Sequence, residues 1–197
     1  EFFKTIDGVA KEEAAILPFV RPPGYVTLPA EAAQLIAPFY DVQEGVVMLP
    51  VLPASPDRDV PHDFPLLGEH NRMNAALVVA LTRWLEAPPG AVNDALRSAE
   101  SPSGRLRRME LGQGVTVIDD SYNANPDSKR AELRVLGEAA GRKIAVLGEM
   151  LEMGGLSGSA HAEVAAVAAE VADRVVLVGE GLGGPEWSDQ LPTDVAA

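Results

Sequence analysis

The chain has 197 residues, of which 47% are apolar, and its 29 Asp and Glu residues outnumber its 16 Lys and Arg residues to give a net charge of −13. This balance predicts a folded acidic protein of one large or two small domains. It argues against binding to nucleic acid and against membrane insertion, which need clustered cations or a long apolar run. The absence of cysteine excludes disulfides, thiolate metal sites and a cysteine nucleophile.

The first half of the chain, as far as about residue 101, is rich in proline and irregular. Apolar spacing, with proline and glycine as breakers, predicts helices and short strands there. In chain order, these are a helix at 6–17, a strand at 25–28, a helix at 31–39, a strand at 45–52, and helices at 71–86 and 93–99.

The second half alternates short apolar runs with alanine-rich stretches. The runs at 115–118, 144–147 and 175–178 are typical of strands buried on both faces, and the stretches at 127–140 and 159–172 are long enough for crossover helices. Right-handed crossovers between such strands predict a mainly parallel, Rossmann-like sheet. Ligands of such sheets gather beyond the carboxyl ends of the strands.

Carboxylates and amides are dense at those strand ends, in residues 119–125, 148–152 and 179–181, which we therefore expect at one edge of the sheet. In the first of these loops, Asp and Asn side chains could accept hydrogen bonds from ribose or orient a polar substrate or phosphate. The alternative is that the loop only starts a helix, because Asp and Asn are ordinary turn and N-cap residues and Pro126 suits a first helical position.

Two amides lie at the predicted start of the helix around residue 71. Asn71 and Asn74 are three residues apart and share a face of the first turn, where amides could bind the donor and acceptor edge of adenine. Alternatively, Asn71 caps the helix and His70 is a hydrogen-bonded structural histidine. Taken alone, this segment favours the structural interpretation.

A basic cluster at 104–108 lies where the two halves meet. Arginine binds phosphate and carboxylate in a bidentate manner, so this cluster could close over a nucleotide, and a solvated hinge is the alternative. His161, in the second crossover helix, is interpreted as a surface residue or a cap partner. The chain lacks the P-loop, H-E-x-x-H and G-x-S-x-G motifs, and the glycines at 179–184 do not form a dinucleotide fingerprint.

Four motifs, taken together, resemble the Mur ligases. They are G-E-H-N-R-M-N-A at 68–75, G-R at 104–105, V-I-D-D-S-Y-N-A-N-P-D-S at 117–128 and A-V-L-G-E-M-L-E-M-G at 145–154. Their order and spacing make the resemblance specific over residues 1 to about 180. The third and fourth motifs, followed by a later histidine, are similar to the family branch that adds D-alanyl-D-alanine to the UDP-N-acetylmuramoyl tripeptide.

The resemblance implies an α/β architecture in two parts. Residues 1–103 would be the later portion of a central ATP-binding domain. Residues 104–197 would be a Rossmann-like C-terminal ligase domain with a mainly parallel sheet, which we expect to be incomplete. A UDP-sugar domain and the phosphate loop would lie upstream. Because the sequence also begins without Met, we expect a fragment or a processed chain.

The resemblance also implies an activity, the ATP- and Mg²⁺-dependent joining of D-Ala-D-Ala to UDP-N-acetylmuramoyl tripeptide through an acyl phosphate. This reaction would take place in the cytoplasm, during synthesis of peptidoglycan precursors, and the fragment alone is expected to be inactive. One alternative is another Mur-type or folylpolyglutamate-type amide ligase. The other is a noncatalytic nucleotide-binding or interaction module.

The same resemblance implies roles for particular residues. Those expected to border the amino-substrate pocket, as catalytic residues, are Tyr122, Asn123 and Asn125. Those expected to bind the nucleotide are His70, Asn71 and Asn74 at adenine, and Arg105 and Asp120 at the ribose and phosphates. Glu13 stands where the family has a lysine that becomes carbamylated and helps bind Mg²⁺, so its carboxylate could supply similar charge. If the register differs by two residues, Lys11 is the modified residue instead.

Overall fold

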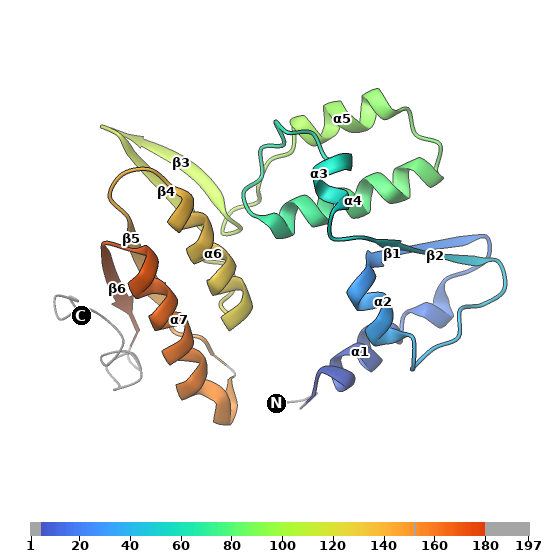
Figure 1. Ribbon diagram of the computed structural model, residues 1–197, viewed down its shortest axis with the longest axis horizontal. Coiled ribbons are helices and arrows are strands. Elements are labelled where there is room, and N and C mark those ends of the chain that lie inside the picture. Colours follow the sequence, from blue (N-terminus) through green and yellow to red (C-terminus); the bar gives the residue numbers. More distant parts are fainter. Residues whose placement is uncertain (1–4, 152, 180–197) are drawn as a thin grey trace. The chain divides into compact units, whose positions relative to one another are not determined.

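The computed structural model describes residues 5–151 and 153–179, and the chain divides into two compact units between Glu100 and Ser101 (Figure 1). We call these the N-terminal unit and the C-terminal unit. Glu152 and the glycine-rich stretch after Gly179, both singled out in the sequence, lie outside the described residues. No described helix is long and apolar enough to cross a membrane.

The N-terminal unit combines a two-stranded parallel sheet with helices. Its elements are α1 (Ile6–Ala14), η1 (Leu17–Phe19), β1 (Gly24–Pro29), α2 (Ala30–Ile36), β2 (Val46–Val51), α3 (Ser55–Asp59), α4 (Glu69–Trp84) and α5 (Pro89–Arg97). The register of the sheet pairs Gly24 with Val46 and Pro29 with Val51. The expected strands and the long helix are therefore present, with shifted ends.

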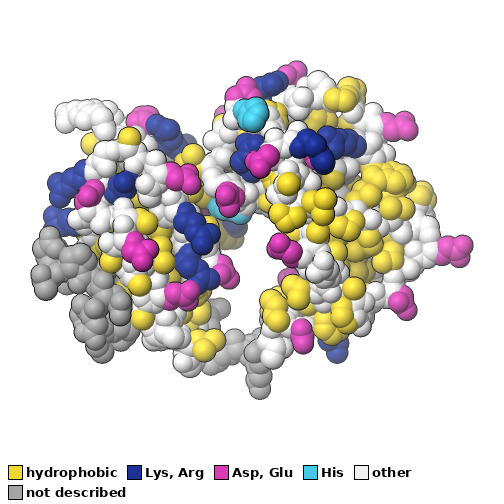
Figure 2. Space-filling view, in the orientation of Figure 1, with side chains coloured by type: hydrophobic (Ala, Val, Ile, Leu, Met, Phe, Trp, Pro, Cys, Tyr) yellow, Lys and Arg dark blue, Asp and Glu magenta, His cyan; other side chains and the backbone are white. Residues whose placement is uncertain are grey.

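Helix α4 is the central element of this unit and contacts both strands, α3 and α5. It buries Ala75, Ala76 and Val79, which join Val51 of β2 and Leu96 of α5 in one core. The helical spacing of these small and apolar side chains explains why this segment was predictable. Outside the core, several large apolar side chains are exposed, and Figure 2 shows them gathered over this unit.

Two differences in the N-terminal unit come from proline. The expected start of α5 at residue 93 is wrong, because α5 begins at Pro89. Proline suits the first helical turn, where no intrahelical N–H donor is needed, although the Pro-Pro-Gly string looks like a helix terminator. The expected helix at 6–17 ends at Ala14 and is followed by the short η1 turn, with Pro18 inside it.

The C-terminal unit contains two small sheets and two long helices. Its described elements are β3 (Arg107–Gly112), β4 (Val115–Asp119), α6 (Pro126–Glu138), β5 (Ile144–Gly148), η2 (Gly154–Leu156), α7 (Ser157–Val171) and β6 (Arg174–Val178). Strands β5 and β6 are parallel, with Ile144 opposite Arg174, and α7 connects them. The predicted α/β fold class with parallel strands is confirmed.

The strand pairing differs from the expected three-stranded parallel ladder. Among the described residues, β4 pairs with β3 as an antiparallel hairpin, so part of the cluster at 104–108 is a strand rather than a solvated hinge. The expectation that the strands are buried on both faces is also wrong for β5. Ala145 and Leu147 are buried with α6 and α7, whereas Ile144 and Val146 are 47% and 63% exposed.

Candidate functional site

The loop after β4 is fastened to the start of the β3–β4 hairpin by Asp119. One oxygen of this carboxylate accepts the Gly104 N–H at 3.1 Å, and the other accepts the Ser121 N–H at 3.2 Å. Hydrogen bonding from Ser121, joined by the Gly104 N–H and the positive charge of Arg107, lowers the pKa of Asp119. The carboxylate therefore stays ionised and holds both backbone segments.

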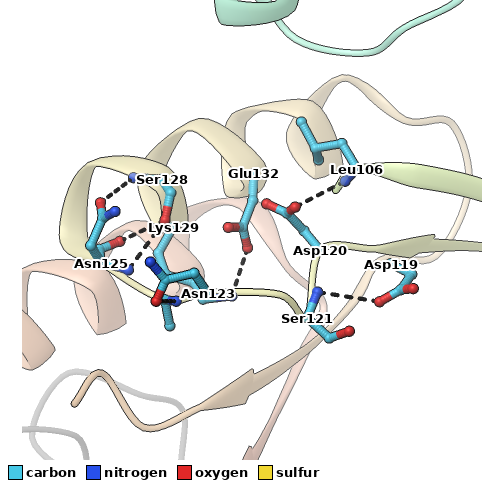
Figure 3. Close-up of polar contacts among 10 residues, drawn as sticks. Leu106, Asp119, Asp120, Ser121, Asn123, Asn125, Ser128, Lys129 and Glu132 are labelled. Carbon is cyan, nitrogen blue, oxygen red and sulfur yellow. Dashed lines mark hydrogen bonds and ion pairs between the residues drawn. The ribbon is translucent and has the colours of Figure 1, made fainter. Parts of the chain in front are cut away.

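Asp120 makes a second connection of the same kind. Its Oδ1 accepts the Leu106 N–H at 2.9 Å, and Leu106 is itself 3% exposed. Figure 3 shows Asp119 and Asp120 diverging from the end of β4 toward these different partners. The two adjacent carboxylates thus position residues 104–106, which include the predicted phosphate ligand Arg105.

Gly104 lets the two segments approach closely. Its φ is +73°, and a Cβ at this position would lie 3.0 Å from the Tyr122 nitrogen and 3.2 Å from the Tyr122 Cβ. The Tyr122 N–H also donates to the Gly104 carbonyl at 3.0 Å. Only glycine provides both this backbone conformation and this space.

Arg105 and Tyr122 meet on the exposed side of this junction. The Arg105 guanidinium carbon lies 4.1 Å from the centre of the Tyr122 ring, which is a cation–π geometry, and Tyr122 is 68% exposed. The structure therefore brings together two residues that the sequence assigned to different substrates. A planar cation and an exposed phenol side by side could bind an anionic group and an adjacent polar group.

The two asparagines of the loop have different surroundings. Asn125 is the N-cap of α6, and its side chain accepts the Ser128 N–H at 2.9 Å while the Ser128 hydroxyl accepts the Asn125 N–H at 3.2 Å. This capping box confirms that α6 begins at Pro126. Asn123 is exposed, and its side-chain oxygen accepts the N–H of the next residue, Ala124, at 2.9 Å.

The loop after β5 is held by a buried histidine. The Met150 N–H donates to Nε2 of His161 at 3.0 Å, and Nδ1 of the same ring lies 2.8 Å from the Ser157 carbonyl oxygen, to which it donates. His161 is 4% exposed, so its interpretation as a surface residue is wrong. Sequence reasoning missed this role because a single histidine gives no signal of a contact eleven residues away.

A further charged group lies behind the first loop. Lys129 of α6 forms an ion pair with Glu132 at 2.8 Å, and these side chains are only 9% and 12% exposed. The Glu132 carboxyl also faces the Asp120 carboxyl across the loop (Figure 3). This group could not be predicted from the sequence, since a Lys and a Glu three residues apart on a helix are usually solvated.

The predicted adenine ligands lie in the N-terminal unit, in the first turns of α4. His70 and Asn74 are exposed, and the Asn71 amide donates to the Leu67 carbonyl at 2.7 Å. Asn71 is not the N-cap, because that position is held by Gly68 at a φ of +88°. A hollow beside this turn is lined by Pro53, Pro56, Asp57, Glu69, His70, Arg72 and Met73.

Arg72 shapes that hollow and was not singled out in the sequence. Its guanidinium donates to the backbone carbonyls of Pro56 at 3.1 Å, Val60 at 3.3 Å and Pro61 at 3.2 Å. These bonds tie the turn around α3 to α4. Arg72 is therefore committed to structure, which leaves His70 as the ring that borders the hollow from α4.

Glu13 lies on α1 with an exposed side chain. Among the residues that the structure describes, no group of three or more His, Asp or Glu side chains could hold a metal ion. Mg²⁺ in proteins is usually held by one or two carboxylates together with water and substrate phosphates, so Glu13 alone could contribute one ligand at most. The assignment of Glu13 to Mg²⁺ therefore stays a prediction.

The structure thus groups the predicted residues by unit. Arg105, Asp120, Tyr122, Asn123 and Asn125 all lie in or against the loop after β4 in the C-terminal unit. The remaining predicted residues, His70, Asn71, Asn74 and Glu13, lie in the N-terminal unit.

Comparison with known proteins shows which family this chain resembles. Residues 104–195 match the family described as Mur ligase, glutamate ligase domain. The chain is 39% identical over 118 residues to the UDP-N-acetylmuramoyl-tripeptide–D-alanyl-D-alanine ligase of Escherichia coli, an alignment that covers 59% of this chain and 26% of that protein. Identity to the protein of the same name from Mycobacterium tuberculosis is 40% over 122 residues, covering 58% and 24%.

Solved structures agree with this result. MurF from Acinetobacter baumannii matches 96% of this chain and 46% of its own, with a TM-score of 0.74 and 25% identity. The MurF ligase from Thermotoga maritima in complex with ADP has a TM-score of 0.76 over 99% of this chain and 48% of its own, and at 19% identity it shows the fold alone. The chain spans about a quarter of the curated relatives and about half of these solved chains.

The fold and these matches make the C-terminal unit similar to a ligase domain. More particularly, the resemblance to the Mur ligase family is confirmed, because residues 104–195 match its glutamate ligase domain. The two curated relatives described above share one name, UDP-N-acetylmuramoyl-tripeptide–D-alanyl-D-alanine ligase.

Proposed function

We propose that this chain is the later part of an ATP-dependent ligase that joins D-Ala-D-Ala to UDP-N-acetylmuramoyl tripeptide in the cytoplasm. The observation that carries the proposal is the loop after β4, in which Asp119, Asp120 and Gly104 hold Arg105 beside Tyr122. Curated relatives of this name, at 39% and 40% identity, support the choice of substrates. Residues 1–103 are then the later portion of the ATP-binding domain.

The first role that we assign is nucleotide binding. ATP would supply the phosphoryl group that activates the substrate carboxylate. The exposed His70 beside its hollow, with Asn71 and Asn74 on the same turn, suits a purine base, because it offers an aromatic ring and amides. Arg105 is exposed and suits a phosphate, since a guanidinium can donate two parallel hydrogen bonds to an anion.

The role that we propose for Asp120 differs from the direct nucleotide contact expected from the sequence. One of its oxygens accepts the Leu106 N–H, and its carboxyl also faces Glu132, so its first role in the proposal is to position Arg105. A contact between Asp120 and ribose would have to use carboxylate lone pairs that these interactions leave free. The proposal therefore places Arg105 at the nucleotide and Asp120 behind it.

The second role is reception of the amino substrate. Tyr122 and Asn123 are exposed on the loop after β4, and Asn125 lies at the N-terminus of α6. A dipeptide such as D-Ala-D-Ala brings a carboxylate and an amine. The Arg105 cation and the partial positive charge of the α6 N-terminus could attract the carboxylate, and the phenol and amide oxygens could orient the amine. These groups would place the amine for attack on the activated carboxyl carbon.

The proposal is tested on the complete ligase that contains this chain. Phosphate release from ATP is measured with both substrates and with each one omitted. We expect release only when UDP-N-acetylmuramoyl tripeptide and D-Ala-D-Ala are both present, with the ligated product identified by mass. Equal or faster release with a single amino acid in place of D-Ala-D-Ala would overturn the substrate assignment.

A further inference from the structure

The buried group behind the β4 loop consists of Lys129 and Glu132 from α6 and Asp120 from the loop. Figure 3 shows the Glu132 and Asp120 side chains directed toward each other from these two elements. Lys129 Nζ donates to Glu132 Oε2 at 2.8 Å, whereas Glu132 Oε1 is buried and meets no hydrogen-bond donor among the described residues. One half of the carboxyl group is therefore satisfied and the other half is not.

A proton resolves this imbalance. Two ionised carboxylates cannot form a hydrogen bond with each other, so Asp120 can satisfy the buried Oε1 of Glu132 only if one of the two carboxyl groups is protonated. Burial, followed by the hydrogen bond with Asp120, raises the pKa of Glu132 to about 8 against the opposing effect of Lys129. The charged groups that act on Glu132 are Lys129 from its own helix and Asp120 from the loop.

We propose that Glu132 is a positioning residue that acts through a proton shared with Asp120, and that this proton keeps Asp120 on the Leu106 N–H and so keeps Arg105 in place. When the proton is present, Glu132 donates to one side of Asp120 while Leu106 donates to Oδ1. When it is lost, two anions face each other in a buried position, and repulsion moves Asp120 off the Leu106 N–H.

Movement of Asp120 affects Arg105, the predicted phosphate ligand, through the backbone of Leu106. Leu106 is 3% exposed, so its N–H has little access to water when Asp120 leaves. Arg105 is the preceding residue, and its guanidinium lies over Tyr122. Loss of the shared proton therefore loosens the Arg105–Tyr122 pair at alkaline pH. This role in the reaction rests on the proposed function, whereas the shared proton does not.

The first experiment measures the proton directly. NMR of the full chain with labelled glutamate follows the Glu132 carboxyl carbon and the Leu106 amide between pH 5 and 10. We expect both signals to titrate together with a midpoint near pH 8. A Glu132 midpoint in the ordinary glutamate range, or a Leu106 amide that does not follow it, would overturn the proposal.

Three variants make the test specific. Glu132→Gln places a permanent N–H donor beside Asp120, so the Leu106 amide should stop titrating near pH 8. Lys129→Met removes the charge that favours ionised Glu132, so the midpoint should move upward. Glu138→Gln, at an exposed position of α6, should leave the midpoint unchanged. A Lys129→Met midpoint that moves downward would contradict the arrangement.

The second experiment connects the proton to the reaction in the complete ligase. We expect KM for ATP to rise about tenfold between pH 7 and pH 9 in the unmodified enzyme and in Glu138→Gln, and to stay nearly constant in Glu132→Gln. An unchanged alkaline rise in Glu132→Gln would overturn the positioning role. If Glu132 titrates near pH 8 but the ligase accepts neither proposed substrate, the shared proton is supported and the proposed function alone fails.

Discussion

At the scale of single residues, the site depends on side chains that fasten backbone rather than on side chains that face solvent. Asp119 and Asp120 look alike in the sequence, but the first holds Gly104 and Ser121 and the second holds Leu106. Gly104 completes the arrangement by allowing the closest approach. The adjacent pair of aspartates is thus explained by three backbone partners, two for Asp119 and one for Asp120.

Gly104→Ala tests this close approach. The new Cβ would lie 3.0 Å from the Tyr122 nitrogen at a φ of +73°, so we expect a loss of roughly 2–4 kcal/mol in the free energy of unfolding. Gly112→Ala is the matched control, because its φ is +85° and nothing lies within 4 Å of the added Cβ. Urea unfolding should show only about 1 kcal/mol for the control. Equal losses in the two variants would contradict the close approach.

Some of these residues could be predicted from the sequence and others could not. Pro126 and Asn125 were predictable because helix capping is a local property, readable within a few residues. His161 was not, because its contact with Met150 joins a helix to a loop that comes earlier in the chain. The burial of Lys129 depends on what covers α6, which a spacing of three residues does not reveal.

At the scale of elements, the parallel strands were predictable and the hairpin was not. Strands β5 and β6 are continuous apolar runs, so their type follows from composition. Strand β3 has only Met109 partly buried and is otherwise exposed, with Arg107 and Arg108 at its start. It therefore carries no apolar alternation, and the same arginines were interpreted as a binding cluster or a hinge.

The N-terminus of α6 provides a prediction that separates stability from activity. Asn125→Ala removes the capping acceptor and should cost about 1 kcal/mol of unfolding free energy, whereas Asn125→Asp keeps an acceptor and should cost little. If Asn125 also orients the amino substrate, Asn125→Asp should still raise KM for D-Ala-D-Ala in the complete ligase. Both variants are compared by thermal unfolding and by steady-state kinetics. A stable Asn125→Asp enzyme with unchanged KM would limit Asn125 to capping.

Helices α3 and α4 are joined by an ion pair that predicts acid sensitivity. Asp59 accepts hydrogen bonds from Arg58 and, across to α4, from Arg83 at 2.9 Å. The hydrogen bond from Arg58, assisted by Arg83 and opposed by burial, lowers the pKa of Asp59 to about 2 from 3.8. Because the folded pKa is the lower one, the stabilisation is present above pH 4 and is lost as the pH falls toward 2.

Arg83→Gln should therefore lose about 1 kcal/mol of unfolding free energy at pH 7 and show a shallower loss between pH 4 and pH 2. The arginines are exposed, so solvent screening keeps this value small. Arg97→Gln is the control, since Arg97 pairs with the exposed Asp63. Urea unfolding at several pH values makes the comparison. An acid slope that is the same in both variants would exclude the α3–α4 ion pair as its cause.

At the scale of the whole molecule, the chain consists of two units with separate cores and separate parts of the predicted site. The N-terminal unit carries the proposed adenine ligands, and the C-terminal unit carries the proposed phosphate and amino-substrate ligands. The order of the four motifs indicated the family, because one motif lies in the N-terminal unit and three lie in the C-terminal unit. The motifs do not establish the roles of individual residues, which stay proposals.

The most direct test of the account concerns the loop after β4 as receiver of the amino substrate. In the complete ligase, Asn123→Ala removes an exposed amide whose only described hydrogen bond is to the adjacent Ala124, so folding should be unaffected. We predict that KM for D-Ala-D-Ala rises at least fivefold while KM for ATP and for UDP-N-acetylmuramoyl tripeptide stays within twofold. An unchanged KM for D-Ala-D-Ala, or an equal rise for all three substrates, would contradict the account.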